Sequence, residues 1–156
     1  MTTRRYRLKL ATWTVVREPG APSPRTLSGP AAVAELARDL DVHRDVLFLG
    51  NQDCMEELLP MADVFLLPSS SESFGLVALE AMSAEVPVVC SNAGGLPEVV
   101  EHGFTGFLHD PTHVEGHTAS VLKLLTNDSL RRTMGRRARR VALERFGPDE
   151  MIGRYV

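Results

Sequence analysis

The 156-residue sequence has only two cysteines, Cys54 and Cys90, and they do not form a Cys-x-x-Cys pair. With so few thiols there is no disulfide framework, and we expect both cysteines to be reduced. Cys90 ends an apolar run, so we expect it to be a small buried hydrophobic residue and not a catalytic thiol.

The sequence also lacks a long hydrophobic segment and a large excess of one charge. No apolar run approaches the roughly 18 residues that a membrane-spanning helix needs, and the basic N-terminus has no apolar core of the kind that a secretory signal contains. The formal net charge of −3 argues against a general nucleic-acid-binding protein. We therefore expect a cytoplasmic protein with no stable membrane insertion and no nucleic-acid partner.

What the sequence does contain is an alternation of short apolar runs with amphipathic helical patterns. The apolar runs predict buried strands at Val46–Leu49, Val64–Leu67, Val86–Cys90 and Gly106–Leu108. Helices are predicted at 31–40, 54–61, 74–84, 96–101, 114–125 and 129–145, with Asp53 as N-cap of the second and Asp128 or Ser129 as N-cap of the last. This order predicts an α/β fold, a doubly wound Rossmann-like parallel sheet covered on both faces.

Ligands of such folds bind at the carboxyl ends of the strands, where loops lead into helices. The predicted loops are 50–53, 68–74, 91–96 and 109–113. Loop 68–74 is small and polar, and Gly75 leaves the first amides of the following helix accessible to a phosphate group. Further along that helix, Glu80 is placed to accept hydrogen bonds from the hydroxyls of a ribose, and Glu72 from a sugar. Each carboxylate also has a simpler interpretation, as a solvated residue or as a charge that favours the positive helix end.

The whole segment from Glu72 to Glu80 resembles the Glu-x7-Glu motif of the retaining, GT-B-fold glycosyltransferases (family 4). The flanking segments 62–69 and 86–89 are similar to that family as well. The resemblance implies that the chain is the C-terminal half of a GT-B fold, in which Glu72 contacts the donor sugar and Glu80 the ribose. It further implies that Ser73, Phe74, Gly75 and Leu76 bind the donor, with the amides after Phe74-Gly75 on its diphosphate, and that no metal ion or other cofactor takes part.

A second segment, Asn92–Val100, is a Gly-Gly turn that leads into a helix, and its glycines permit positive φ and a close approach of the backbone. In the family this loop lies beside the donor site, which implies a donor-binding role for Gly94 and Gly95.

A narrower resemblance, carried by Val46–Asp53, is to the N-acetylglucosaminyl-malate synthases of bacillithiol biosynthesis. It implies transfer of N-acetylglucosamine from its UDP ester to L-malate, with Gly50 and Asn51 near the nucleobase.

The sequence departs from the family at two places. Glu85 stands where the family usually has glycine; we expect it to face solvent with a right-handed helical or extended backbone. The other departure is the N-terminus: residues 1–27 are atypical, a strand within 6–16 leads into linker-like residues 17–30, and the domain proper is expected at 28–156.

A complete enzyme of this kind also has a preceding Rossmann-like domain that holds most of the acceptor site. The leading hypothesis is therefore that the chain supplies the donor-binding half of such an enzyme and is inactive alone. The alternatives are a catalytically inactive nucleotide-binding or interaction fragment, and a folded remnant that self-associates as a homo-oligomer.

Two further patterns have a simpler interpretation. His109, His113 and His117 recur every four residues, but Pro111 and Gly116 argue against the continuous helix that a metal site would need, so we expect a loop with solvated histidines. The arginines between 131 and 140 could meet anionic lipid or a phosphate polymer. The apolar residues Leu130, Met134, Ala138 and Val141 favour an ordinary helix with a solvated basic face.

Overall fold

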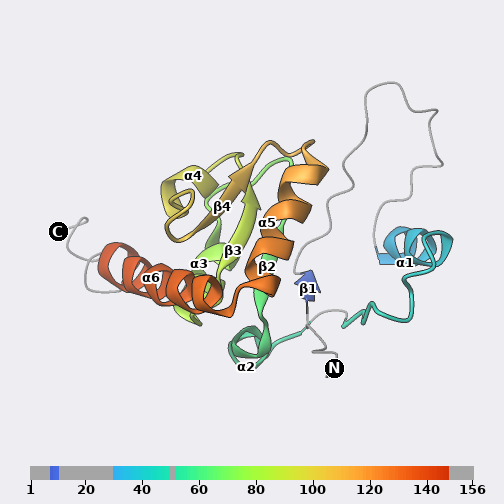
Figure 1. Ribbon diagram of the computed structural model, residues 1–156, viewed down its shortest axis with the longest axis horizontal. Coiled ribbons are helices and arrows are strands. Elements are labelled where there is room, and N and C mark those ends of the chain that lie inside the picture. Colours follow the sequence, from blue (N-terminus) through green and yellow to red (C-terminus); the bar gives the residue numbers. More distant parts are fainter. Residues whose placement is uncertain (1–7, 11–29, 50–51, 148–156) are drawn as a thin grey trace.

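Four parallel strands form the central sheet of the protein. The computed structural model describes residues 8–10, 30–49 and 52–147. The strands are β1 (Leu8–Leu10), β2 (Val64–Leu67), β3 (Val88–Ser91) and β4 (Gly106–His109), and they lie in the order β1-β2-β3-β4 (Figure 1). Phe65 pairs with Val88, and Val88 in turn with Gly106. The predicted α/β class with a parallel sheet is confirmed.

The helices follow the predicted order with shifts of a few residues at their ends. The structure contains α1 (Pro30–Asp39), α2 (Met55–Leu58), the 3-10 helix η1 (Leu59–Met61), α3 (Leu76–Ser83), α4 (Leu96–Val99), α5 (Val114–Thr126) and α6 (Asp128–Phe146). The predicted helix 54–61 is divided into α2 and η1 because Pro60 has no amide hydrogen and cannot continue an α-helical hydrogen-bond pattern.

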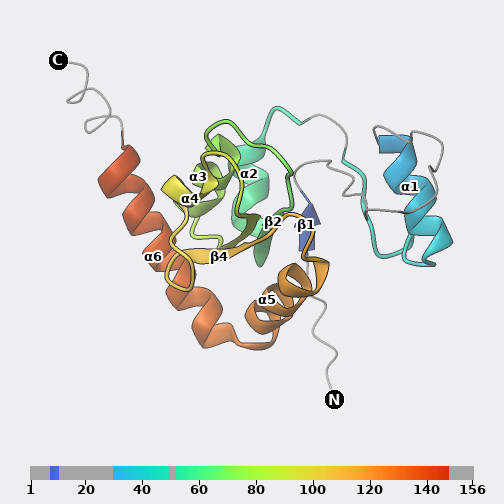
Figure 2. The same ribbon diagram turned by 90° about the horizontal axis from the view of Figure 1, so that it is seen from above.

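Helices cover both faces of the sheet, as the apolar strands require. On one face Phe65, Leu67 and the other core residues of alternate strand positions pack with α3, α4 and the C-terminal part of α6. On the other face Val64, Val89 and Phe107 pack with α5 and with Met134 of α6. Helix α6 therefore contributes to both cores, and Figure 2 shows it crossing from the α5 side toward α4 along the β4 end of the sheet.

The predicted strand Val46–Leu49 is not formed. These residues have no regular structure, and Leu47 is 80% exposed. The reason lies in the pairing of β2, whose two edges are occupied by β1 and β3. Helix α1 and residues 42–49 lie to one side of the sheet in both ribbon views (Figures 1 and 2), and neither core cluster of the described residues includes a residue from 30–49.

Both predicted N-caps were wrong. The N-cap of α2 is Cys54 instead of Asp53, and no side chain caps its amides. Helix α6 begins one residue earlier than expected, so that Asn127 is the N-cap and its side-chain oxygen accepts a hydrogen bond from the amide of Leu130, at 3.0 Å. An asparagine is as suitable as aspartate or serine at this position, and Asn127 directly precedes the two predicted candidates.

The expected backbone of Glu85 was also wrong, since its φ is +62°. The chain ends α3 with hydrogen bonds from the amide of Glu85 to Met82 and from the amide of Val86 to Ala81. This pattern closes a helix through a residue in the left-handed region, where glycine is usual. The side chain does lie half-exposed, as predicted, 3.9 Å from the guanidinium of Arg139.

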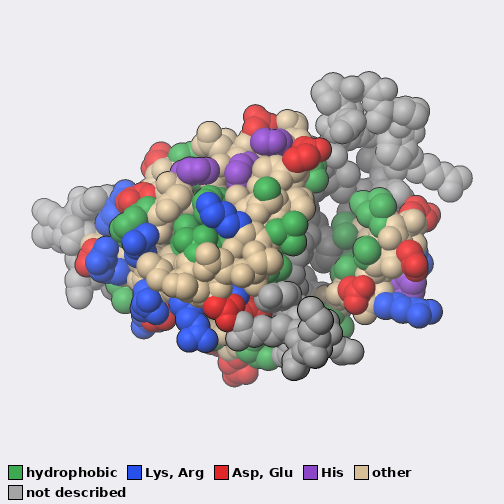
Figure 3. Space-filling view, viewed as in Figure 1, with side chains coloured by type: hydrophobic (Ala, Val, Ile, Leu, Met, Phe, Trp, Pro, Cys, Tyr) green, Lys and Arg blue, Asp and Glu red, His purple; other side chains and the backbone are tan. Residues whose placement is uncertain are grey.

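The predicted core face of α6 is confirmed, since Met134, Ala138 and Val141 are buried. Its basic face is only partly solvated. Lys and Arg side chains gather over α6 in Figure 3, yet Arg131 bridges Asp63 and Asp128, and the guanidinium of Arg137 lies over the ring of Phe104. Several of these arginines therefore fasten α6 to the rest of the domain.

Candidate functional site

The carboxyl ends of β2, β3 and β4 bring three loops to one edge of the sheet. Strand β2 ends at Leu67, β3 at Ser91 and β4 at His109, and each loop leads into a helix. The amide of Asn92 donates to the carbonyl oxygen of His109, at 2.6 Å, which joins the second loop to the third. Such an edge is where ligands bind in open parallel sheets.

The glycine pair of the second loop packs directly against the backbone of the first. The amide of Gly95 donates to the carbonyl oxygen of Glu72 at 3.1 Å. A Cβ on Gly94 would lie 1.7 Å from that same oxygen, and a Cβ on Gly95 would lie 2.7 Å from Cα of Phe74. Gly94 also has a φ of +55°. The predicted close approach of the backbone is therefore present, and its partner is the loop that carries Glu72.

The start of α3 presents unpaired amides at this edge. Gly75 is the N-cap, with a φ of +86°, and its carbonyl accepts from the amides of Ala78 and Leu79. Among the residues that the structure describes, the amides from Phe74 to Val77 find no acceptor. An eight-residue helix with free N-terminal amides and an adjacent glycine can bind an anion such as a diphosphate.

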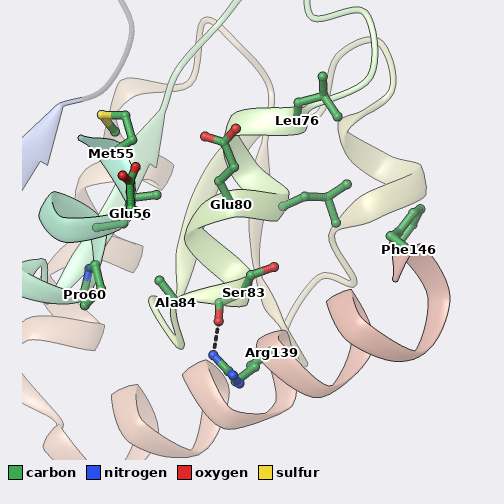
Figure 4. A pocket seen from close by; sticks show the side chains of 11 residues that line it. Met55, Glu56, Pro60, Leu76, Glu80, Ser83, Ala84, Arg139 and Phe146 are labelled. Carbon is green, nitrogen blue, oxygen red and sulfur yellow. Dashed lines mark hydrogen bonds between the residues drawn. The ribbon is translucent and has the colours of Figure 1, made fainter. Parts of the chain in front are cut away.

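The two residues that carry the predicted carboxylates have different surroundings near this helix start. Glu80 is exposed and points into a hollow between α2 and α3, where Met55 and Glu56 face it (Figure 4). Glu72 is half-buried, and its carbonyl is held on the α4 side by Gly95.

Burial raises the pKa of the Cys90 thiol, and the charge of Glu72 raises it further. Cys90 is thus the buried, inert residue that its sequence position predicted.

The hollow beside Glu80 has a cavity volume of about 690 Å³ and is open to solvent. Its walls come from α2 with η1, from α3 and from the C-terminal part of α6. At its lower end the guanidinium of Arg139 donates to the carbonyl oxygen of Ser83 (Figure 4). The lining residues are Met55, Glu56, Leu59, Pro60, Leu76, Leu79, Glu80, Ser83, Ala84, Arg139 and Phe146.

Most of the predicted site residues therefore converge on one place. Glu72, Ser73, Phe74, Gly75 and Leu76 form the loop and helix start, Gly94 and Gly95 support them, and Glu80 lies one helical turn beyond Leu76. Gly50 and Asn51 lie outside the described residues. Met55, Glu56 and Phe146 also line the hollow and were not predicted as site residues. The apolar periodicity of their helices explains Met55 and Phe146 as packing residues, and no sequence pattern indicated a site at Glu56.

The histidines form a cluster at the same edge, contrary to the expected solvated loop. His117 lies in α5, which continues through Gly116, and it is only 5% exposed. Its ring lies 5.3 Å from that of His109, whose Nε2 is 2.8 Å from Oγ of Ser120. The rings of His102 and His113 meet that of His109 edge to face, with centroids 5.9 and 6.0 Å away. Burial and the neighbouring imidazoles lower the pKa of His109.

Within the described part of the chain, no group of three or more histidine, cysteine, aspartate or glutamate side chains is arranged to hold a metal ion. None of the described helices combines the length and the apolar character that crossing a bilayer requires.

The sequence and the fold both match known proteins. The family described as Glycosyl transferases group 1 matches residues 28–141. The chain is 42% identical over 123 residues to N-acetyl-alpha-D-glucosaminyl L-malate synthase of Bacillus anthracis, with 79% of this chain and 32% of that protein covered. It is 39% identical over 122 residues to D-inositol 3-phosphate glycosyltransferase of Corynebacterium kroppenstedtii, with 76% and 27% covered. The chain thus spans about a third or less of the length of these relatives.

Two solved structures illustrate the likeness of the fold. HepE of Anabaena, crystallised in complex with UDP, matches with a TM-score of 0.76 and 29% sequence identity over 80% of this chain and 35% of that one. The C-terminal domain of a group 1 glycosyl transferase (LpcC) from Francisella tularensis matches with a TM-score of 0.69 and 20% identity, over 81% of this chain and 66% of that domain.

Proposed function

The chain belongs to the glycosyl transferases group 1 family, and from this membership we propose that it is the donor-binding half of a retaining glycosyltransferase. The observation that carries the proposal is the free N-terminus of α3, with Glu72 before it and Glu80 one turn behind it. A nucleotide-sugar has a ribose, a diphosphate and a sugar in one line, which suits this order of groups. The complex of the Anabaena relative with UDP supports the same ligand class.

Each part of the ligand has a proposed partner. The amides from Phe74 to Val77 bind the diphosphate, since they are free and lie at the positive end of the α3 dipole. Glu80 accepts hydrogen bonds from the ribose hydroxyls at the mouth of the hollow, and Glu72 positions the donor sugar on the other side. Gly94 and Gly95 act behind the site by holding the backbone of Glu72.

The chemistry that this site favours is loss of the diphosphate as the sugar develops oxocarbenium character. The preorganised amides stabilise charge on the departing diphosphate, which is the kind of electrostatic stabilisation that lowers a barrier most. In a retaining reaction the leaving phosphate assists the incoming hydroxyl on the same face of the sugar, so no protein nucleophile is required. We propose that no metal ion takes part, so a chelator is expected to leave UDP affinity unchanged.

For the donor and acceptor we propose N-acetylglucosamine on UDP and L-malate. The support is the identity to the Bacillus anthracis synthase, which extends over 79% of this chain. Because the chain spans 32% of that protein, the acceptor site is proposed to lie largely on a preceding domain, and the isolated chain is proposed to bind the donor without transferring it. An inactive nucleotide-binding fragment is the second candidate, favoured by the same short coverage.

A calorimetric titration with UDP tests the site. Wild-type chain is expected to bind, and Glu80→Gln to bind about ten- to a hundredfold more weakly, because hydrogen bonds to a charged group contribute about 1.5–3 kcal/mol. Glu57→Gln, an equal charge change on α2 outside the hollow, is the matched control. Equal affinity of Glu80→Gln and wild type would reject the ribose role. If the isolated chain released UDP from UDP-N-acetylglucosamine in the presence of malate, its proposed inactivity would be rejected.

A further inference from the structure

Loop 68–75 brings little apolar surface of its own to the edge of the sheet. From Pro68 to Ser73 it consists of proline, serines and Glu72, and Phe74 is its large apolar side chain. The glycine pair supports the backbone of this loop from the α4 side, as described above. A second support has to hold Phe74 if the free amides of α3 are to keep one geometry before a ligand arrives.

That second support is the C-terminal residue of α6. The rings of Phe74 and Phe146 meet edge to face, with centroids 6.0 Å apart and an interplanar angle of 78°. This is a favourable geometry for an aromatic pair. Phe146 also lines the hollow together with Leu76 and Glu80 (Figure 4), so it borders both the loop before α3 and the groove beside it.

Phe146 is itself fixed by its neighbour in the sequence. The guanidinium of Arg145 lies over the Phe146 ring, 5.4 Å from its centroid. The same guanidinium donates to Oε1 of Glu101 at 2.8 Å and to the carbonyl oxygen of Glu98 at 3.3 Å. Glu98 lies on α4, which begins directly after Gly95. The segment from Gly94 to Glu101, which contains α4, thus supports loop 68–75 twice, through the glycines and through the Arg145–Phe146 pair.

We propose that Phe146 is a positioning residue for the nucleotide-sugar: through its contact with Phe74 it holds the backbone of loop 68–75 and the free amides of α3 in the geometry that binds the diphosphate. The inference rests on the proposed function for the identity of the ligand. A loop that is already ordered pays less conformational entropy when it binds. Loss of the Phe146 ring therefore weakens binding even though Phe146 is not a partner of the phosphates.

The first test compares Phe146→Ala, Phe146→Tyr and Phe104→Ala in the full chain. Phe104 is the matched control, because it is also partly buried against the same core cluster and lies under an arginine, but it belongs to the turn before β4. Three quantities are measured: the midpoint of thermal unfolding, the affinity for UDP, and the hydrogen exchange of the amides of Ala78, Leu79 and Gly95. These three amides donate to carbonyls of Gly75 and Glu72 and so report on the loop without any ligand.

Phe146→Ala is expected to weaken UDP binding about 3- to 10-fold, the range that an aromatic pair contributes, and to accelerate exchange of the three amides. Phe146→Tyr, which keeps the ring, is expected to restore both. Phe104→Ala is expected to lower the unfolding midpoint while changing neither. The proposal is overturned if Phe146→Ala leaves exchange and affinity at their wild-type values, or if Phe104→Ala changes them equally.

The test remains decisive if the wild-type chain does not bind UDP or if a variant does not fold. If wild-type chain does not bind UDP, the proposed function fails, and the exchange rates still decide whether Phe146 orders the loop. If Phe146→Ala does not fold, Phe146→Leu and Phe74→Leu are measured singly and together. Effects on exchange that are less than additive support the contact as the cause, and fully additive effects overturn it.

Discussion

Two apolar runs of nearly the same composition have opposite fates in this protein. Val64-Phe-Leu-Leu67 is a central strand in which Val64, Phe65 and Leu67 have no exposed surface. Val46-Leu-Phe-Leu49 forms no strand, and Leu47 is 80% exposed. The difference lies in the partners, since β2 pairs on both edges and packs under helices on both faces. An apolar run becomes a strand only where a neighbouring strand has a free edge to receive it.

The two apolar runs are expected to differ most in what a truncated leucine costs in stability. Leu67→Ala is expected to lower the free energy of unfolding by about 2–5 kcal/mol, because it leaves a cavity in a filled core. Leu47→Ala, the same chemical change in the exposed run, is expected to stay within about 0.5 kcal/mol. Urea unfolding of both variants measures the difference. Equal losses would mean that 46–49 is packed and that its predicted strand exists in solution.

The same difference between the two runs limits which strands can be predicted from the sequence. Periodicity located β2, β3 and β4 and the helices around them, because each of these elements buries the face that its own pattern shows. It failed at 46–49. Whether this run forms a strand depends on the pairing of β2 with Leu8–Leu10, which lie in an atypical segment more than fifty positions before β2. No local pattern contains that information.

For the site the division is similar. The loop 68–75, the helix start and the Gly94–Gly95 turn were predictable, because they lie close together in the sequence and resemble a known motif. Phe146 was not predictable, because it reaches Phe74 from the end of the last helix, across 72 positions of sequence. The histidine cluster was missed because the sequence was searched for a site on one continuous helix, whereas His109 ends β4 and His117 reaches it from α5.

Two glycines with positive φ, Gly94 and Gly103, lie in packed and in open surroundings respectively. Gly94→Ala is expected to cost about 2–4 kcal/mol, from its positive φ together with the clash against the carbonyl of Glu72. Gly103 also has a positive φ, of 78°, but a Cβ there would meet nothing within 4 Å. Gly103→Ala is therefore expected to lower the free energy of unfolding by only about 1–2 kcal/mol. Only the first variant is expected to weaken UDP binding. Equal stability losses would show that loops 68–75 and 91–96 are not in contact.

Among the described residues other than glycine, Glu85 and Asp41 have a positive φ. Glu85 lies at the end of α3, in the packed part of the domain, and Asp41 lies just after α1, to one side of the sheet. Glu85→Gly is expected to raise the free energy of unfolding by about 0.5–1 kcal/mol, because relief of the left-handed backbone exceeds the entropic cost of glycine. Asp41→Gly is expected to change little, since aspartate tolerates this conformation. Glu85→Gln controls for the lost charge near Arg139. A loss of stability in Glu85→Gly would contradict the helix-end conformation described above.

The smallest expected effect is a pH dependence. The pKa of His109 is lowered from its ordinary 6.5, so the unfolded chain binds protons more readily there, and stability is lost as the pH falls through 6.5. The pKa of Asp110 is lowered from 3.8 by hydrogen bonds from Thr112, and its own loss of stability begins only below that value. His109→Gln is expected to make the midpoint of thermal unfolding less dependent on pH between pH 7 and about pH 5. An unchanged slope in His109→Gln would contradict the role of the cluster.

Hydrogen exchange of the wild-type chain with and without UDP tests whether the start of α3 is the diphosphate site of a nucleotide-sugar. The amides from Phe74 to Val77 have no acceptor among the described residues, so they are expected to exchange fast alone and to become protected when UDP binds. Amides in the middle of α5, on the opposite face of the sheet, are expected to exchange as before. Binding of UDP without protection of Phe74–Val77, or protection confined to other elements, would contradict the account.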